Sequence, residues 1–564
     1  MRIFKVKSNY MKKMQFFKGY LFVVFAFFAL VVAGCKNKNE EEVEESQTTS
    51  SSTSSGTTVE TNYGDDEDDD VNAQTWNDTI SIVWNGSSAA VDKSVEGVTI
   101  SNSNGYVSIT STVKHIAYKV SGEGTGQLRI ESDHYKFKLI MAGLTLTNST
   151  GPAINNQCHK SCYVVLTGAN NLTDGSAYTS STEDQKAAFF SEGQILVSGT
   201  GSLTAIGNYK HALCSDDYIR IYGGTLNLTA KVSDGIHTND GVIINGGTIT
   251  VAAANDGIQC DTSSIVISGG TINVSSGDKG ILAYGNIEVS GGTINVKSNG
   301  KGIKTKGDLS VSAGEIVVVA SSSYTVSYLP RRQGGPGGGQ GGGQPGGGQG
   351  GGQPGGGQGG DQPGGGNSSS GPEGIESKGA MTITGGHVFA QAEDDAINSG
   401  GDMTISGGYV GAYSTGNDGL DANGNCYIKG GVVYAIGSSS PEVGIDANTE
   451  KQKQLYVTGG SLIAIGGLEQ GASLSQACYQ ASWNSSTWYA LNNNGNLVLA
   501  FKTPASGGTP LVVSTSSTPT LQSGVTASNG TAYFNGMALV GATISGGSNV
   551  SLTAYSSQSG SGPR

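Results

Sequence analysis

The sequence predicts an all-β protein whose body is a right-handed parallel β-helix, followed by a small C-terminal β segment. Three observations lead to this fold class: a repeat of about 22 residues, alternation of apolar and polar residues within each repeat, and an unusual composition. Glycine accounts for 91 of the 564 residues, and charged residues make up only 14%. Such a composition favours short strands joined by tight turns over helices.

A phrase built around two adjacent glycines recurs along the chain. In its first run the leading glycine returns after 23, 23 and 22 residues, and in its second run after 22 and 23. The alternation on both sides of each pair indicates strands, and a fixed period of this length indicates stacked coils. Equivalent side chains should then form rows along the axis, for example Ile244, Ile267 and Val289. The leading glycines are Gly223, Gly246, Gly269, Gly291, Gly385, Gly407 and Gly430.

Residues 1–34 have the features of a lipoprotein signal peptide. Several lysines precede an apolar run that ends in small residues directly before Cys35, as in a secretory signal. Small residues before a cysteine resemble the bacterial lipobox, which predicts cleavage before Cys35 and its lipidation. The alternative is a membrane-spanning anchor, for which the run is short. Lys36 and the acidic residues after it are typical of lipoproteins on the outside of the outer membrane, so we expect a surface-exposed protein anchored there.

The remaining chain divides by composition into a stalk, a repeat region and a tail. Residues 35–71 are rich in Ser, Thr and acidic residues, with too few apolar side chains to order them, and predict a flexible stalk. Residues 72–490 hold the β-helix, which residues 333–366, almost wholly Gly, Gln and Pro, interrupt as one enlarged, disordered turn. Residues 491–564 lose the period and predict a β cap or accessory domain over the open sheet edge.

The chain is acidic, with a formal charge of −13. Without the six basic residues of positions 1–34, 26 basic residues oppose 45 acidic ones, and the formal charge becomes −19. Such a balance excludes nucleic acid as an expected partner.

Aspartates recur at the turns with the period of the coils. Asp234, Asp256 and Asp278 lie 22 residues apart, and Asp395 and Asp418 occupy the same position later in the chain. Carboxylates stacked about 4.8 Å apart repel one another by about 3.5 kcal/mol at an effective dielectric constant of 20. Bound Ca²⁺ would offset this repulsion, whereas the structural alternative is that Asp-Gly simply favours turns. The candidate calcium ligands are Asp216, Asp217, Asp234, Asp240, Asp256, Asp261, Asp278, Asp395, Asp418 and Asp421.

Aromatic residues occupy outward positions in the second half of the repeat. Their faces can stack on sugar rings, and the regular rise of the coils suits a linear polymer. The alternative is that the Gly-rich loop or the C-terminal segment covers them. The candidate sugar-binding residues are His387, Phe389, Tyr409, Tyr413 and Tyr434.

Motifs for catalysis are weak. Parallel β-helices include pectate lyases, whose calcium site needs a neighbouring Arg or Lys as base, and only Lys279, Lys301 and Lys304 suggest themselves. The six histidines show no metal-ligand spacing along the chain, and no P-loop or zinc motif occurs. Cys158 and Cys162 are close enough in sequence to pair. The sequence therefore favours a protein that is not an enzyme.

The Asp-Gly-Ile turns, the Gly-Gly-Thr-Ile strands, the Gly-rich insertion and the segment from Phe501 to Pro504 resemble a family of bacterial carbohydrate-binding domain-containing proteins. The resemblance extends over residues 98–545. It implies a calcium-bound, pectate-lyase-like right-handed β-helix that binds plant polysaccharides, such as cellulose or polygalacturonate, without cleaving them. Asp234, Asp256 and Asp418 match the family's Asp-Gly-Ile turn, whereas the turns at Gly280, Gly302, Gly374 and Gly444 lack the aligned acid, except that Asp278 lies one residue early.

These observations predict a non-catalytic, calcium-supported polysaccharide-binding lipoprotein. Two alternatives remain. The first is an adhesin or structural surface protein without a sugar ligand, and the second is a polysaccharide lyase.

Overall fold

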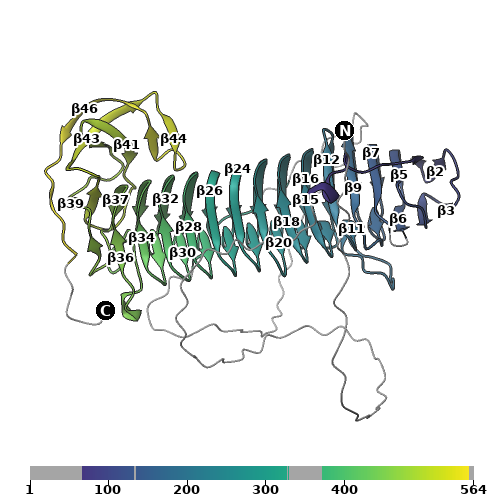
Figure 1. Cartoon of the computed structure of the whole chain (residues 1–564), viewed down its shortest axis with the longest axis horizontal. Helices are drawn as coiled ribbons and strands as arrows, with labels where there is room; N and C mark the ends of the chain where they lie inside the picture. The colour runs from purple at the N-terminus through teal and green to yellow at the C-terminus, as the bar shows by residue number, and fades with distance from the viewer. Residues whose placement is uncertain (1–65, 133–134, 327, 329–370, 558–564) are drawn as a thin grey trace, which may run out of the picture. The chain divides into compact units, whose positions relative to one another are not determined.

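The fold is described from a computed structural model, over residues 66–132, 135–326, 328 and 371–557. The chain divides into two units, Met1–Glu60 and Thr61–Arg564, and the described residues belong to the second. In that unit, short strands stack coil upon coil (Figure 1), which confirms the predicted all-β parallel β-helix. Among the described residues, no helix is long and apolar enough to span a membrane. The predicted signal peptide and Cys35 lie outside the described residues.

Each complete coil contributes strands to three parallel ladders. The first ladder consists of β5 (Ile116–Thr125), β7 (Phe137–Thr147), β9 (Cys162–Thr167), β12 (Ile195–Gly199), β15 (Tyr218–Ile221), β18 (Gly241–Ile244), β21 (Ile265–Ile267), β24 (Ile287–Ser298), β26 (Leu309–Ala320), β28 (Met381–Ile383), β31 (Met403–Ile405), β34 (Cys426–Ile428), β36 (Leu455–Val457) and β38 (Ser473–Leu474).

The second ladder shares the long, bent strands β7, β24 and β26 with the first. Its other members are β10 (Ala169–Thr173), β13 (Ser202–Gly207), β16 (Thr225–Ala230), β19 (Thr248–Ala253), β22 (Thr271–Ser276), β29 (His387–Ala392), β32 (Tyr409–Ser414), β35 (Val432–Ile436) and β37 (Ser461–Ile465).

The third ladder is a separate sheet. After β3 (Val98–Ser103), which pairs antiparallel with the next strand, its members are β4 (Tyr106–Ser111), β6 (Gln127–Ser132), β8 (Ile154–Asn156), β11 (Ala187–Ser191), β14 (His211–Ser215), β17 (Ile236–Thr238), β20 (Ile258–Cys260), β23 (Ile281–Ala283), β25 (Ile303–Thr305), β27 (Ile375–Ser377), β30 (Ile397–Ser399) and β33 (Leu420–Ala422).

Rows of aliphatic side chains fill the space between the ladders. Ile244 pairs with Ile267, and Ile267 with Val289, in three consecutive coils, which confirms the predicted row. All three side chains are buried in one core that runs from Ile80 to Val512. A buried side chain of this size contributes about 1.5–3 kcal/mol relative to an exposed one. Stacking therefore stabilises coils that could not bury an apolar face alone.

The Asp-Gly-Ile turn requires its glycine because the turn passes close to the core. A Cβ added to Gly257 would lie 2.2 Å from Cγ1 of Val274 and 2.5 Å from the carbonyl oxygen of Gly280. The same contact recurs one coil earlier, where a Cβ on Gly235 would lie 2.1 Å from Val251. The glycine therefore recurs because the turn passes so close to the neighbouring strand that a larger residue would not fit.

Both ends of the coil stack carry antiparallel strands. At the start, β1 (Asp78–Gly86) pairs parallel with β5 and antiparallel with β2 (Ser88–Val91). At the end, β42 (Leu511–Ser514) pairs antiparallel with β37 and with β39 (Cys478–Ala481), which also pairs with β47 (Thr553–Ala554). The last parallel strand ends at Leu474, earlier than the predicted limit at residue 490. Pairing with β42 covers the open edge, as expected of a cap.

A six-stranded antiparallel sheet makes up most of the C-terminal segment. It lies beside the coils in Figure 1 and contacts the outer face of the second ladder. A short 3₁₀ turn, η1 (Thr449–Lys451), lies in one of the last coils. The sheet's strands are β40 (Trp488–Asn493), β41 (Asn496–Lys502), β43 (Pro519–Ser528), β44 (Thr531–Tyr533), β45 (Ala538–Val540) and β46 (Thr543–Asn549).

The coil register resumes after the Gly-rich insertion, as predicted. Ile303 before it pairs with Ile375 after it, and Leu309 pairs with Met381. The insertion itself, residues 333–366, lies outside the described residues.

The prediction of a stalk up to residue 71 is wrong at its end. The short helix α1 (Asp66–Asp69) is followed by residues that pack on the first ladder. Asp69 is only 2% exposed, accepts a hydrogen bond of 2.6 Å from the Tyr218 hydroxyl, and forms a 2.9 Å ion pair with Arg220. Composition alone indicated a solvated acidic run, but these two partners on β15 hold its last part against the coils.

Candidate functional site

A groove of about 900 Å³ follows one column of turns in the N-terminal half. Its floor comes from the residues that directly precede the first-ladder strands β5, β7, β9, β12, β15, β18 and β21, so it passes over seven consecutive coils. At about 4.8 Å per coil, this span is about 29 Å. We call this feature the N-terminal groove; it is lined by Asp68, Asp69, Lys114, His115, Tyr135, Lys136, Lys160, Ser161, Gln194, Asp217, Tyr218, Asp240, Thr262 and Ser263.

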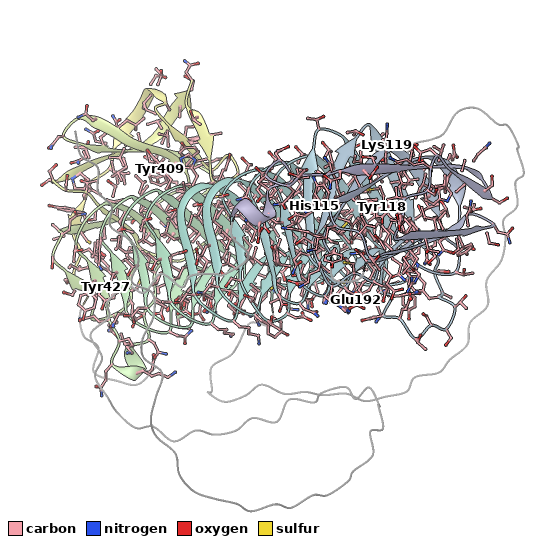
Figure 2. All side chains as sticks on the ribbon, turned by 45° about the vertical axis from the view of Figure 1, so that its right-hand side comes forward. His115, Tyr118, Lys119, Glu192, Tyr409 and Tyr427 are labelled. Atoms are coloured by element: carbon pink, nitrogen blue, oxygen red, sulfur yellow. The ribbon has the colours of Figure 1, made fainter. Side chains whose placement is uncertain are left out.

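Cations and aromatic rings occupy the first part of the groove. Lys114 and Lys160 are exposed, and the Lys114 ammonium lies 5.0 Å from the centre of the half-buried Tyr135 ring. Lys136 forms a 3.1 Å ion pair with Asp68, an acid of the α1 segment. Figure 2 shows His115 among the side chains of this part of the molecule. Together these groups offer hydrogen-bond donors and ring faces, the two kinds of contact that sugars accept.

Two predicted calcium ligands form the other part of the groove. Tyr218 pairs with Gly241, so Asp217 and Asp240, which precede them, occupy equivalent positions in neighbouring coils. Burial raises the pKa of Asp217, and the Asp240 carboxylate adds to the effect. Asp240 is exposed. The pair thus presents adjacent carboxylates toward solvent, where a hard cation could bridge them to an acidic ligand.

A second group of acids lies in the last coils of the third ladder. Ile397 pairs with Leu420, and Leu420 with Ile445, which places Asp395 beside Asp418 and Asp421 beside Asp446 in consecutive coils. The next coil adds Glu469. The Asn398 amide bridges two of these carboxylates, at 2.9 Å from Asp395 and 2.7 Å from Asp421. We call Asp395, Asp418, Asp421, Asp446 and Glu469 the acidic cluster.

The acidic cluster offers the oxygen donors that calcium takes, although no three of its carboxylates bring an oxygen within 4.8 Å of one another. Asp395, Asp418 and Glu469 are less than a tenth exposed, and none of the cluster's acids forms an ion pair with a described Lys or Arg. Burial raises the pKa of Asp418 to about 8 and, together with neighbouring carboxylates, raises the pKa values of Asp395 and Asp446. Buried carboxylates need a compensating cation to remain charged. Oxygen-only donors of this kind fit Ca²⁺.

The first-half acids are arranged differently from the prediction. Asp234 and Asp256 occupy one row, as expected, but the next position in that row is Lys279 and not Asp278. Ile258 pairs with Ile281, and counting back two residues from each gives Asp256 and Lys279. This coil contains one more residue, between Cys260 and Ile265, which displaces Asp278. Lys279 lies 2.5 Å from Asp278 and 3.8 Å from Asp256, so a lysine compensates these acids.

Asp216 and Asp261 share a row but are not neighbours. Asn239 lies between them, because Ser215 pairs with Thr238 and Thr238 with Cys260. Asp216 forms a 2.6 Å ion pair with Lys186. The two carboxylates therefore cannot share one calcium ion.

The prediction that outward aromatic residues bind sugar is wrong for the most buried ones. Phe389 and Tyr434 are 3% and 2% exposed, because they pack against the C-terminal sheet around Phe501 and Phe534. Tyr409 lies 4.9 Å from Tyr533 between ring centres, and Figure 2 shows it beside the C-terminal strands. His387, 4.1 Å from Tyr533, and the half-buried Tyr413 belong to the same contact region. The alternative of a covering segment holds here.

Sequence reasoning missed a half-buried aromatic pair on the first ladder. Tyr427 and Tyr456 stack at 5.0 Å between ring centres with an angle of 11° between the planes, and the Lys429 ammonium lies 4.6 Å from the Tyr427 ring. They occupy the same position on β34 and β36. Figure 2 shows Tyr427 away from the C-terminal sheet. The coil between them is longer than the usual period, at 29 residues, which concealed the match.

The lysines that were considered as lyase bases are all engaged in ion pairs. Lys279 contacts two aspartates, and Lys301 lies 3.0 Å from Glu373 and 2.7 Å from Glu376. Lys304 lies 3.3 Å from Glu376. The pKa values of Lys279 and Lys301 are raised, since their carboxylate partners outweigh burial. Lys279 and Lys301 are thus held protonated and are poor bases, whereas burial lowers the pKa of Lys304.

Comparison with known proteins decides the family. A family model described as "Carbohydrate-binding domain-containing protein" matches residues 103–419, more than half of the chain. The chain belongs to this family. Its membership supports binding of carbohydrate, and the N-terminal groove lies mainly within the matched residues.

One solved structure is similar to the chain. It is described as "Structure of the polysaccharide lyase-like protein from C. thermocellum, Gadolinium derivative", with 24% identity and a TM-score of 0.36. The match covers 42% of this chain and all of that one. The comparison with curated proteins gave no match.

Proposed function

We propose that this carbohydrate-binding chain is a non-catalytic receptor for an acidic plant polysaccharide, such as polygalacturonate, at the bacterial surface. The observation that carries the proposal is the N-terminal groove, which follows seven consecutive coils and so matches the length of a linear polymer better than that of a single sugar. The exposed Lys114 and Lys160 favour a polymer with carboxylates over neutral cellulose.

Calcium has two roles in this proposal. In the groove it bridges Asp217 and Asp240 to sugar carboxylates, which is necessary because protein and polymer are both anionic at neutral pH. In the acidic cluster it neutralises buried carboxylates and so stabilises the last coils. The proposal also includes anchoring to the outer membrane through lipid on Cys35. Incorporation of labelled palmitate into the wild type but not into Cys35→Ser tests that anchor.

A binding experiment tests the groove. Calorimetric titration with polygalacturonate oligomers and with cello-oligomers, each with Ca²⁺ and with EDTA, should show calcium-dependent binding of the acidic oligomer. Lys114→Gln combined with Lys160→Gln should weaken that binding about 100-fold, corresponding to two lost charged contacts of about 1.4 kcal/mol each. Tyr427→Ala is the matched control, since this ring lies on β34, outside the groove.

The same titration separates the alternatives. If Tyr427→Ala lowers the affinity for the acidic oligomer as much as the double lysine variant does, the stacked tyrosine pair also contributes to the binding site. Absence of binding by every oligomer would favour an adhesin or structural role. Ultraviolet absorbance from an unsaturated product during incubation with polygalacturonate and Ca²⁺ would identify a lyase instead, because elimination creates a conjugated double bond.

A further inference from the structure

Two histidines and one aspartate from neighbouring coils converge on a single point in the third ladder. Leu213 pairs with Ile236, which places His211, two residues before the first, beside Asp234, two residues before the second. His237 follows on the same strand as Ile236. Oδ2 of Asp234 lies 3.2 Å from Nδ1 of His211 and 3.1 Å from Nδ1 of His237. The three donor atoms lie within 4.8 Å of one another.

The surroundings hold this carboxylate in place. Asp234 is 2% exposed and His211 is 6% exposed. Oδ1 of Asp234 accepts hydrogen bonds from the backbone N–H of Asp256 at 3.0 Å and from the Asn255 amide at 2.8 Å. These two donors leave Oδ2 facing the imidazoles, so the carboxylate is oriented before any ligand arrives.

The outer ring nitrogen of His237 also has a carboxylate partner. Its Nε2 lies 3.5 Å from Oδ2 of Asp261, while its Nδ1 faces Asp234. A carboxylate behind a histidine is the arrangement that orients metal-binding imidazoles and raises their basicity. The His211 and His237 rings stack at 4.2 Å between centres with 23° between the planes, so one ring must turn before a single ion can lie in both ring planes.

The spacing of the donors suits a small divalent ion. Bonds of about 2.0–2.1 Å to nitrogen and oxygen place adjacent donors of one ion about 3 Å apart. The two nitrogen–oxygen distances found here, 3.1 and 3.2 Å, have that length already.

The alternative is a pair of ordinary N–H···O hydrogen bonds to Asp234. One contact argues against that reading for His211. Its Nδ1 accepts a hydrogen bond from the backbone N–H of Asp234 at 3.3 Å, which requires a lone pair on that nitrogen, whereas donation to Oδ2 requires a proton there. A metal ion would use the same single lone pair of Nδ1, so it would take the place of this backbone hydrogen bond.

We propose that His211, Asp234 and His237 bind a divalent first-row transition ion, with Zn²⁺ as the probe, at a site separate from the calcium sites. Two imidazole nitrogens and one carboxylate are donors that suit zinc, copper, nickel or iron, whereas Ca²⁺ takes oxygen donors. Three protein donors leave at least one coordination position for water or a ligand. Because the donors come from consecutive coils, the ion would link β14 to β17.

Zinc titration in the presence of saturating Ca²⁺ tests the site. Metal-depleted wild-type protein should bind one Zn²⁺ per chain here, and His211→Gln, Asp234→Asn and His237→Gln should each weaken binding at least about 100-fold. His159→Gln is the matched control, because its imidazole is exposed and lies 3.9 Å from Glu192, away from this cluster. Thermal melting without metal identifies variants that have lost the fold.

Crystals of the wild type soaked in Zn²⁺ make the test independent of the variants. An anomalous peak at the zinc edge within bonding distance of the two Nδ1 atoms and Oδ2 would support the proposal. Lack of a peak at this position would overturn it. Zinc affinity that stays unchanged in folded variants, or falls equally in His159→Gln, would overturn it as well.

Discussion

Asp256 and Lys279 occupy the same position in consecutive coils, with the lysine Nζ 3.8 Å from Oδ1 of the aspartate. The position before them in the row is Asp234, and the position after them is Lys301. The row therefore changes from acid to base along the axis and becomes acidic again at Glu373, Asp395 and Asp418. Stacking gives each charge a neighbour one coil away, so compensation acts between coils as well as along the chain.

Removal of this lysine should destabilise the coils. Lys279→Gln leaves Asp256, which is 2% exposed, beside Asp234 and Asp278 without a cation. We expect a loss of about 1–3 kcal/mol in the free energy of unfolding, because a buried charge then lacks its partner. Denaturant titration at neutral pH in EDTA measures it. Lys93→Gln, which breaks an exposed pair with Asp78, should cost at most about 1 kcal/mol. Equal losses in both variants would contradict the prediction.

The glycine of the Asp-Gly-Ile turn should not tolerate a methyl group. Gly257→Ala brings a Cβ to 2.2 Å from Val274 and 2.5 Å from a backbone oxygen, so turn or strand must shift. We expect a loss of about 1–3 kcal/mol, the usual cost of overpacking. Gly223→Ala is the control, since its Cβ would meet its nearest atom at 3.3 Å. Thermal melting compares the two, and equal melting temperatures would show that the turn can yield.

Calcium should stabilise the protein through the acidic cluster. EDTA should lower the melting temperature of the wild type, because the buried carboxylates lose their cation. Asp418→Asn should be about as stable as the wild type in EDTA, since burial raises the pKa of Asp418 to about 8 and keeps the carboxyl mostly neutral there, but should gain less from Ca²⁺. Glu123→Gln, at an exposed position outside the cluster, should respond to Ca²⁺ like the wild type. If Ca²⁺ raises the melting temperature of Asp418→Asn as much as that of the wild type, Asp418 is not a calcium ligand.

The covered aromatic residues should affect stability and not ligand binding. Tyr434 donates a 2.8 Å hydrogen bond to the Lys502 carbonyl and packs 5.2 Å from the Phe501 ring centre. Tyr434→Ala should therefore cost about 3–5 kcal/mol, the range for large buried side chains, and should loosen the C-terminal sheet. Its affinity for acidic oligomers, measured below the melting transition, should equal that of the wild type. Lower affinity with unchanged stability would indicate that Tyr434 binds sugar.

The coil rows could be predicted because one period relates every partner. That rule gave the row of Ile244, Ile267 and Val289, but it misplaced Asp278, because the preceding coil holds one extra residue between Cys260 and Ile265. The His211–Asp234–His237 cluster was missed because metal spacing was sought along the chain, whereas the first two residues are one coil apart. A search at the coil period would have found it.

Two other features left little trace in the pattern. The C-terminal sheet has no repeat, so the sequence did not reveal which outward rings it covers. The cations of the N-terminal groove, Lys114, Lys136 and Lys160, come from coils of unequal length before the regular repeat begins.

The sequence left open a disulfide between Cys158 and Cys162, because they are only four residues apart. In the structure both cysteines are free and buried.

Glu373 and Glu376, which both form ion pairs with Lys301, predict a pH optimum of stability. Burial raises the pKa of Glu373 to about 7, above its ordinary value of 4.5. Burial acts in the same direction on Glu376, but Lys301 and its other lysine partners outweigh it and lower its pKa to about 2. The contribution of Glu373 is therefore complete below pH 4.5 and is lost as pH rises through 7. That of Glu376 is complete above pH 4.5 and is lost as pH falls toward 2.

The variant Glu373→Gln isolates one side of this optimum. This variant lacks the Glu373 carboxyl, which loses its proton between pH 4.5 and 7. The free energy of unfolding of the variant should therefore fall less over that interval than the free energy of unfolding of the wild type. The expected difference is on the order of 1–3 kcal/mol, since one pKa unit corresponds to about 1.4 kcal/mol. Below pH 4.5 both proteins should lose stability in parallel, because Glu376 and its lysines remain. Denaturant titrations at several pH values in EDTA measure the slopes, and identical slopes above pH 4.5 would show that Glu373 does not titrate there.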